Sequence, residues 1–322
     1  MNKNLKLWLI LATVLTVAGL LMMVVAMSAF HWDFTQLNTV PFETNTHTVS
    51  DAFHSIAFDT STTDIFIVPS ANSQCQVVCS EPENLQHSVT VVDGILTIQE
   101  VDTRKWNQYI GFSFGSSKIT VYLPQAEYQA LTIRESTGDI EIAKDFYFQN
   151  IDIKVSTGDI ANYASADNTR IHTSTGRIRV EGVSTSTLEL VVSTGNATVV
   201  DTQCNTLVSR GSTGDLILKN VTAIDTFRIE RSSGDVTFEV SSADQIYVET
   251  ETGDVTFDAS DAGQIYLGTD TGDVRGSLQS PKVFLIETDT GDIDVPKSTS
   301  GGLCEISTDT GDIEITVLNT AS

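Results

Sequence analysis

The chain has 322 residues, with 42 acidic against 18 basic side chains and a net charge of −24 at pH 7. A surface this negative disfavours nucleic acid and anionic lipid as partners, since both would be repelled. Cationic peptides, divalent metal ions or basic cell-wall components fit the charge better. All 42 acidic residues follow residue 30, so the charge belongs to the part of the chain after an apolar N-terminal segment.

The first predicted element is a transmembrane helix over residues 7–30. Leu7 to Phe30 is uncharged and strongly apolar. A helix of this length spans about 36 Å, enough to cross a hydrocarbon core of ~30 Å with some tilt. Lys3 and Lys6 precede it, which favours a cytoplasmic tail of residues 1–6 and an extracytoplasmic remainder. The alternative is a cleaved signal peptide, with Ala26-Met27-Ser28 as a small-residue cleavage site, although the apolar run is long for one.

Two segments separate this helix from the rest. Residues 31–52 are mostly polar and aperiodic, which predicts a stalk. Residues 53–124 hold irregularly spaced apolar runs, such as 64–68 and 119–123, typical of strands. Because solenoids need atypical end units to cover strand edges, we interpret 53–124 as an irregular β cap or the first distorted coils. The aromatic residues of this block are expected to cap the core, with an exposed loop as the alternative; they are Trp106, Tyr109, Phe112 and Phe114.

The remaining segment, 125–318, is built from a repeat. A short motif, Ser/Asp-Thr-Gly-Asp in its commonest form, recurs ten times with gaps of 18 to 20 residues. Its glycines are Gly138, Gly158, Gly176, Gly195, Gly214, Gly234, Gly253, Gly272, Gly291 and Gly311. A spacing this regular indicates stacked coils, or rungs, of about 19 residues each. Glycine tolerates positive φ, and Ser, Thr and Asp bond to nearby backbone, so the motif predicts a tight corner between two strands.

Side-chain direction can be predicted from the columns around the glycine. The column two residues after it is apolar in all ten rungs: Ile140, Ile160, Ile178, Ala197, Leu216, Val236, Val255, Val274, Ile293 and Ile313. The column five residues before it is apolar except at Ser209. Spacing of two is the strand period, so each rung has a strand entering the corner and a strand leaving it. The sequence therefore predicts an all-β, single-chain β-solenoid of the parallel β-helix type.

The order of motifs resembles a known family. Phe53-His54-Ser55-Ile56 is followed by Asp64-Ile65-Phe66-Ile67-Val68-Pro69, Asp93-Gly94-Ile95-Leu96-Thr97-Ile98, Lys105-Trp106, Ile119-Thr120-Val121-Tyr122-Leu123-Pro124 and the repeats. From about residue 50 to 317 this arrangement is similar to the bacterial "putative adhesin" family of β-strand-repeat proteins, a domain of unknown function. The resemblance implies a bacterial envelope protein, with some relatives linked to envelope stress, and it supplies no catalytic residues.

The four cysteines do not form a disulfide scaffold. Cys204 and Cys304 fall at inward or corner positions and are expected to be small buried residues. Cys75 and Cys79 are about 13 Å apart if extended, too far for a disulfide unless a turn intervenes. No histidine lies near these pairs at the spacing of a zinc motif, so a tetrahedral metal site is not expected.

The last four rungs carry two parallel columns of carboxylates. They are Glu251, Asp270, Asp289 and Asp309, two residues before the glycine, and Asp254, Asp273, Asp292 and Asp312, one residue after it. Stacked carboxylates repel, by about 3.5 kcal/mol at a dielectric of 20 and 4.8 Å, so they either splay into solvent or bind cations. Calcium, which prefers several hard oxygen ligands, is the candidate ion, and no other cofactor is expected.

Three function classes remain open. The first is a membrane-anchored, non-catalytic envelope protein whose solenoid binds a cell-wall component, a cationic ligand or a membrane partner protein. The second is a structural rod that polymerises through its ends, where residues 313–317 would present an uncapped strand edge. The third is a calcium-dependent polysaccharide-active β-helix enzyme, but such a cleft needs long inserted loops and no glycine gap exceeds 20 residues. We therefore expect no enzymatic activity.

Overall fold

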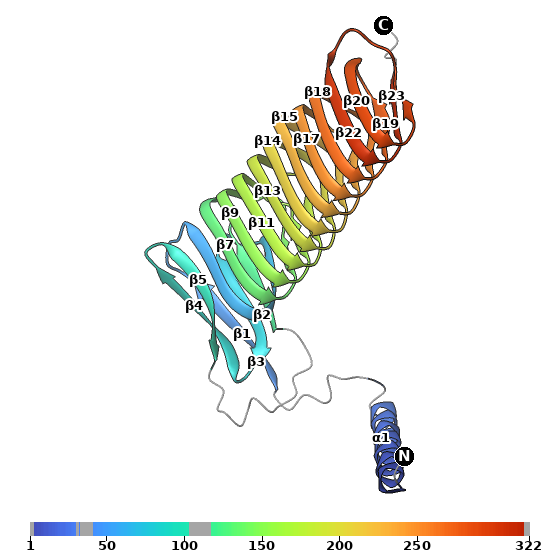
Figure 1. The fold of residues 1–322 in the computed structure, drawn as a ribbon. Coiled ribbons are helices and arrows are strands. Elements are labelled where there is room, and N and C mark those ends of the chain that lie inside the picture. Colours follow the sequence, from blue (N-terminus) through green and yellow to red (C-terminus); the bar gives the residue numbers. More distant parts are fainter. Residues whose placement is uncertain (1–2, 30–31, 33–40, 103–116, 319–322) are drawn as a thin grey trace.

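The computed structural model describes residues 3–29, 32, 41–102 and 117–318 (Figure 1). It confirms a single-chain β-solenoid with one N-terminal apolar helix. The aromatic positions at 106, 109, 112 and 114 lie outside the described residues, as do most of the first half of the predicted stalk and the first two residues of the tail.

The helix α1 runs from Lys3 to Ala29. The part long and apolar enough to cross a membrane is Lys6–Ser28, which has 23 residues and a mean hydropathy of 2.7. Its most apolar stretch is not buried against the rest of the protein. These bounds agree with the predicted segment 7–30. Length and composition fit both a membrane anchor and a signal sequence.

The N-terminal block holds six strands, of which three run antiparallel to their neighbours. They are β1 (Phe42–Val49), β2 (Ser55–Pro69), β3 (Cys75–Pro82), β4 (Leu85–Val92), β5 (Ile95–Asp102) and β6 (Ser117–Leu123). Strand β1 pairs with β3, β3 with β6, and β4 with β5, all antiparallel. The prediction of a stalk over 31–52 is therefore wrong in its second half. Alternating residues of β1 hydrogen-bond along β3, and this pairing rather than a hydrophobic period makes the segment a strand.

The same block contains regular coils of the solenoid. Strand β2 pairs in parallel with β7 and β8 on one side and with β5 and β6 on the other. Thr62 pairs with Thr137 at the end of β7. Thr63 therefore occupies the corner position that Gly138 has in the next coil. The predicted block 53–124 thus contains both of its expected alternatives: the first coils of the solenoid, from about residue 55, and a cap of β3 and β4 that covers the first edge together with β1 (Figure 1).

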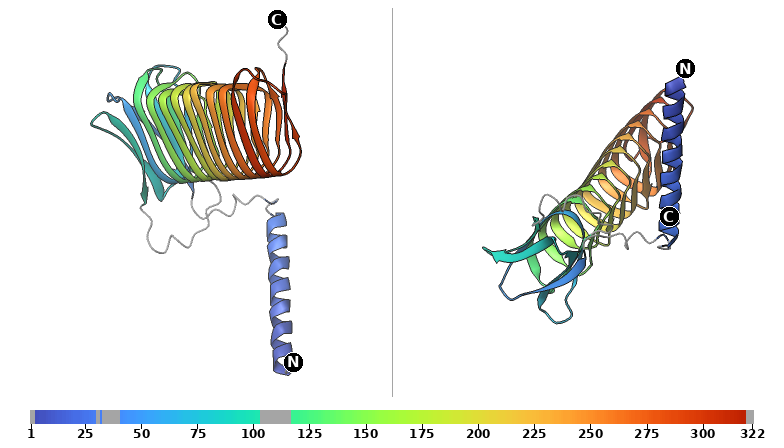
Figure 2. Two further views of the ribbon diagram at one scale, coloured as in Figure 1. Left: turned by 45° about the horizontal axis from the view of Figure 1, so that its top comes forward. Right: turned by 90° about the horizontal axis from the view of Figure 1, so that it is seen from below.

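The strands that follow belong to the glycine repeats, and some run on from one rung into the next. They are β7 (Glu127–Thr137), β8 (Ile140–Ile142), β9 (Tyr147–Thr157), β10 (Ile160–Asn162), β11 (Ser165–Thr175), β12 (Ile178–Glu181), β13 (Ser184–Thr194), β14 (Ala197–Thr213), β15 (Leu216–Ser233), β16 (Val236–Glu239), β17 (Ser242–Thr252), β18 (Val255–Thr271), β19 (Val274–Leu278), β20 (Lys282–Thr290), β21 (Ile293–Asp294), β22 (Gly302–Thr310) and β23 (Ile313–Val317). Their parallel stacking produces the rod seen in Figure 2.

The corners explain why glycine recurs. At Gly253 φ is +149°, which disfavours residues with a Cβ, and an added Cβ would lie 2.2 Å from the carbonyl oxygen of Gly234 in the rung below. The corner backbone also continues the ladder, since Gly253 N donates to Thr271 O at 3.0 Å. Glycine is therefore required both by conformation and by the close approach of stacked corners.

The predicted inward columns form the core. Residues two after the glycine are buried in nine rungs, and Ile293 is the exception with 48% of its surface exposed. Cys204 and Cys304 are buried as expected, and all four cysteines are free thiols.

The exposed Ile293 reflects an unexpected rung order. Strand β22 pairs with β18 on one side and with β20 on the other, and β23 likewise lies between β19 and β21. The segment 302–317 is thus inserted between the two rungs that precede it in sequence. The prediction that residues 313–317 form the open edge is wrong, because the edge rung is made by β20 and β21.

A buried ion pair and two glycines accommodate this order. Gly302 pairs with Lys282, and an added Cβ on Gly302 would lie 1.7 Å from Gly263 O, so a side chain there would clash. The ammonium group of Lys282, a residue only 1% exposed, reaches Asp261 at 2.6 Å. Lys282 thereby ties the edge rung to the rung on the far side of the inserted one.

Candidate functional site

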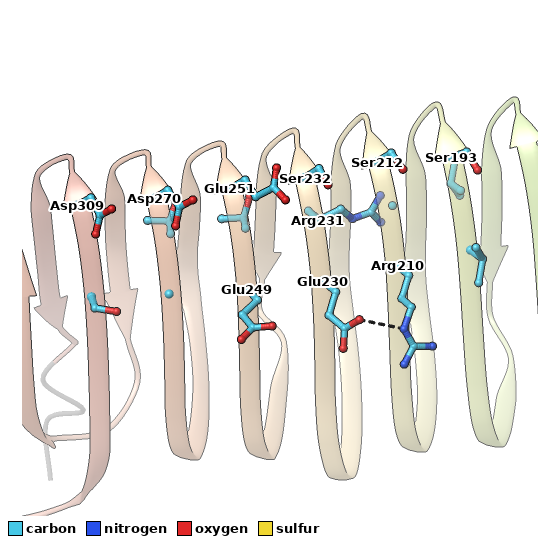
Figure 3. Close-up of a pocket in the computed structure, with 17 residues that line it drawn as sticks. Ser193, Arg210, Ser212, Glu230, Arg231, Ser232, Glu249, Glu251, Asp270 and Asp309 are labelled. Carbon is cyan, nitrogen blue, oxygen red and sulfur yellow. Dashed lines mark hydrogen bonds and ion pairs between the residues drawn. The ribbon is translucent and has the colours of Figure 1, made fainter.

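The outer face of the entering strands carries a groove of about 620 Å³ over β13, β14, β15, β17, β18 and β22 (Figure 3). Two outward columns, four and two residues before the glycine, line it. The first holds Arg210, Glu230, Glu249, Gly268 and Ser307, and the second Ser212, Ser232, Glu251, Asp270 and Asp309. Figure 3 shows the second column as a row in which Asp309 follows Asp270, as the rung order requires.

Charge compensation along this groove is uneven. Glu230 is bound by Arg228 at 2.9 Å and by Arg210 at 3.0 Å, and these hydrogen bonds, that of Arg228 first, lower the pKa of Glu230. The carboxylates of Glu249, Glu251, Asp270 and Asp309 have no ion pair or hydrogen bond to other residues in the described part of the chain. The groove therefore has a compensated end and an end with four uncompensated, exposed carboxylates.

Gly268 leaves a gap between Glu249 and Ser307. A second depression of about 280 Å³ adjoins the groove there and shares Glu230, Glu249, Gly268 and Ser307 with it. Its wall is a pair of stacked rings, Tyr247 and Tyr266, with centroids 4.9 Å apart and planes at 7°. The hydroxyl of Tyr266 donates to Gln264 Oε1 at 3.0 Å, and that of Tyr247 to Gln245 Oε1 at 3.2 Å. Aromatic rings beside carboxylates form a surface suited to organic cations.

The predicted acidic columns have different surroundings. Glu251, Asp270 and Asp309 line the groove, whereas Asp289 is on the edge rung. The column after the glycine is a hydrogen-bond ladder. Asp254 Oδ1 accepts the backbone N–H of Asp273 at 2.8 Å, Asp273 Oδ1 accepts that of Asp312 at 2.7 Å, and Asp312 Oδ1 accepts that of Asp292 at 3.0 Å.

This ladder gives the second column a structural explanation. The same bond runs from Asp139 N to Asp64 Oδ1 in the first coil at 3.0 Å, far from the acidic C-terminal region. Arg275 also contacts Asp273 at 2.7 Å. Calcium binding by the eight acids stays a prediction, and among the described residues neither column contributes to a group of three close potential metal ligands.

Sequence reasoning missed Glu249, Gly268, Tyr247 and Tyr266. Glu249 belongs to an outward column with no consistent chemistry, running from Arg210 and Glu230 to Gly268. The one available signal was the recurrence of Gln-Ile-Tyr at 245–247 and 264–266, which places two tyrosines one above the other.

Comparison with known proteins gives one family and several distant structures. A family model described as Toastrack DUF4097 matches residues 53–259 and 202–322. Similar solved structures include a putative lipid binding protein from Parabacteroides distasonis ATCC 8503, with 15% identity and a TM-score of 0.46 over 87% of this chain and 98% of that one. A putative adhesin from Bacteroides fragilis NCTC 9343 has 14% identity and a TM-score of 0.39 over 86% and 97% of the two chains. No curated protein matches. Because both TM-scores are below 0.5, no role is assigned to this chain from these structures. The family match spans both the cap and the repeats.

Proposed function

The chain belongs to the Toastrack DUF4097 family, whose name states no activity, and we propose that it is a non-catalytic binding protein anchored in a bacterial cell membrane. The family match confirms the resemblance to β-strand-repeat adhesins seen in the sequence. In this proposal α1 is the anchor, the N-terminus is cytoplasmic and the solenoid is extracytoplasmic. The uncharged segment 7–30 and the two lysines before it, Lys3 and Lys6, support that orientation.

The observation that carries the binding role is the uncompensated end of the groove. Four carboxylates without protein partners surround the gap at Gly268, and two stacked tyrosines flank it. Such a surface recognises a ligand with several positive charges spaced along the rod, such as an amine-bearing wall polymer or a basic segment of a membrane partner protein. A cationic ligand would relieve the repulsion between the stacked acids.

Binding to a labelled oligolysine, measured by fluorescence anisotropy with the full-length chain in detergent, tests this role. The triple variant Glu249→Gln/Glu251→Gln/Asp270→Asn should weaken binding about tenfold, equivalent to about 1.4 kcal/mol. The control Glu127→Gln/Glu141→Gln/Asp258→Asn removes the same charge from exposed positions outside the groove and should change affinity less than twofold. Equal losses in both variants would show that only net charge matters, and the groove would lose its assigned role.

The anchor has its own test. Protease added to intact protoplasts should remove the solenoid while α1 stays with the membrane. Recovery of a mature protein that begins near residue 29 would instead identify the segment as a cleaved signal.

A further inference from the structure

A buried polar cluster lies between the cap and the first coil, far from the acidic groove. Cys79 and Glu81 come from β3, and His87 from β4. The Cys79 sulfur, a Glu81 carboxylate oxygen and a His87 ring nitrogen all lie within 4.8 Å of one another. Cys79 and Glu81 are fully buried and His87 is 4% exposed.

The strand pattern brings these side chains together. Cys79 and Glu81 are two residues apart, so they point to the same face of β3. Residues 83–84 then reverse the chain, and β4 carries His87 back beside Glu81. Spacing along the chain gave no zinc motif at these cysteines, whereas the fold of the cap brings His87 close to Cys79.

Hydrogen bonds hold the cluster in place. His87 Nδ1 lies 2.6 Å from Glu81 Oε2, and the backbone N–H of His87 donates to the same oxygen at 2.8 Å. Asn45 Nδ2 donates to Glu81 Oε1 at 2.8 Å, and the Thr63 hydroxyl lies 3.3 Å from His87 Nε2. Four strands therefore contribute to one site, and their side chains are fixed before any ligand arrives.

The donor set has the chemistry of a zinc site. A thiolate, an imidazole and a carboxylate are the three side-chain ligand types that Zn²⁺ uses in proteins. Zn²⁺ with one thiolate, one carboxylate and one neutral imidazole has no net charge, which suits a site without solvent. Binding of the metal would displace the thiol proton of Cys79.

We propose that Cys79, Glu81 and His87 bind one Zn²⁺ ion, which joins the cap to the first coil. His47 on β1 lies outside this cluster of close ligand atoms but on the same face of the cap. His47 pairs with Val77 and so faces the same side as Cys79, and its Nε2 atom is buried without a hydrogen-bond partner among the described residues. Two ligands of a tetrahedral zinc ion, each about 2.0 Å from it, are roughly 3.3 Å apart. Zinc entry therefore requires the 2.6 Å contact between Glu81 and His87 to lengthen.

The test is metal analysis of the full-length chain, purified in detergent without a histidine tag. After chelator treatment, incubation with ZnCl₂ and gel filtration, mass spectrometry should find one zinc per chain. Cys79→Ser and His87→Gln should each lower this content at least fivefold. The control Cys204→Ser, which removes a buried thiol inside the repeats, should keep it.

Cobalt provides a spectroscopic readout that the unaltered chain alone can give. Co²⁺ added to the unaltered chain should produce a thiolate-to-cobalt charge-transfer band, and Cys79→Ser should remove it. Absence of retained zinc and of this band would overturn the proposal. So would a zinc content that both variants leave unchanged, since the metal would then be held by the surface carboxylates.

Discussion

The inward column three residues before the glycine holds two buried charged residues. Glu135 is 5% exposed and Arg231 is 4% exposed, where other rungs have threonine, valine or glycine. The guanidinium group of Arg231 occupies the space above Gly211, where an added Cβ would lie 1.9 Å from Nη1. Its Nη2 donates to Ser209 at 2.7 Å, while burial lowers the pKa of Arg231 to about 10.

These contacts explain an irregularity that the sequence shows but does not interpret. Ser209 breaks a column that is otherwise apolar, and Gly211 two residues later leaves a gap. Both residues accommodate one side chain from the next rung. A single column cannot reveal this, because the small residues Ser209 and Gly211 accommodate Arg231, which lies in another rung some 20 residues later.

Glu135 should make stability depend on pH. Burial raises the pKa of Glu135 to about 7, against hydrogen bonds from Thr60 and nearby backbone that lower it. Between pH 4.5 and 7 the unfolded chain loses the Glu135 proton while the folded chain keeps it, so the free energy of unfolding falls as pH rises. The loss is about 3 kcal/mol and is complete above pH 7.

Urea unfolding at pH 4.5 and 7.5 checks this with Glu135→Gln, which lacks the titrating group. The unaltered chain should lose about 3 kcal/mol more than Glu135→Gln over this range. The control Glu141→Gln, at an exposed position on β8, should follow the unaltered chain. Identical pH profiles for all three proteins would contradict the assignment.

At the scale of the element, each repeat corner has a glycine that permits stacking, and most have an aspartate after it whose carboxylate accepts a backbone N–H from the neighbouring corner; Arg177 and Asn196 replace the aspartate in two corners. The sequence predicted the corner, the two strands and the inward columns, because an apolar period of two beside a fixed glycine leaves few alternatives. It did not predict the ladder, because an aspartate that accepts a backbone hydrogen bond at a corner and an aspartate that is only solvated give the same sequence pattern. It left open whether residues 53–124 are a cap or the first coils, because Thr63 replaces the glycine that marks the other corners.

The ladder predicts different effects for two substitutions at Asp254. Asp254→Asn keeps an oxygen that can accept the Asp273 N–H, as Asn196 does for Asp215 at 3.0 Å, so its effect on stability should be small. Asp254→Ala removes the acceptor and should cost about 1–2 kcal/mol. Urea unfolding of both variants distinguishes a structural acid from one that only carries charge, for which alanine and asparagine would behave alike.

At the scale of the whole molecule, the order of the last rungs could not be predicted from the columns. The rungs around Gly291 and Gly311 carry the same residues at the corner, so either could stack on β18. Specific contacts outside the repeat motif distinguish them, above all the pair formed by Lys282 and Asp261. The resulting edge rung exposes Leu285 to 59% and Ile293 to 48%, and it is here that a polymerising rod would have to make its contact.

Removing one partner of the Lys282–Asp261 pair should lower the free energy of unfolding strongly, whereas replacing both partners should lower it little. Asp261→Ala leaves the Lys282 ammonium buried without its carboxylate and should cost about 3–5 kcal/mol, whereas Asp261→Ala/Lys282→Met should recover most of that loss. Hydrogen exchange should place the loss of protection in β20 and β22. If the double variant were as unstable as the single one, the loss would not come from the unpaired Lys282 ammonium.

The inserted rung also has a consequence for how the chain is made. Residues 282–294 are synthesised before residues 302–317, yet they finish outside them. Up to β19, a growing chain can add each coil to the free end of the rod as it emerges from the ribosome or the membrane. The next coil must then wait unpaired, or pair with β18 and later be displaced, until the following segment takes its place. Completion of this end is therefore a strand-exchange reaction, and a chain interrupted before residue 302 cannot reach the same end structure.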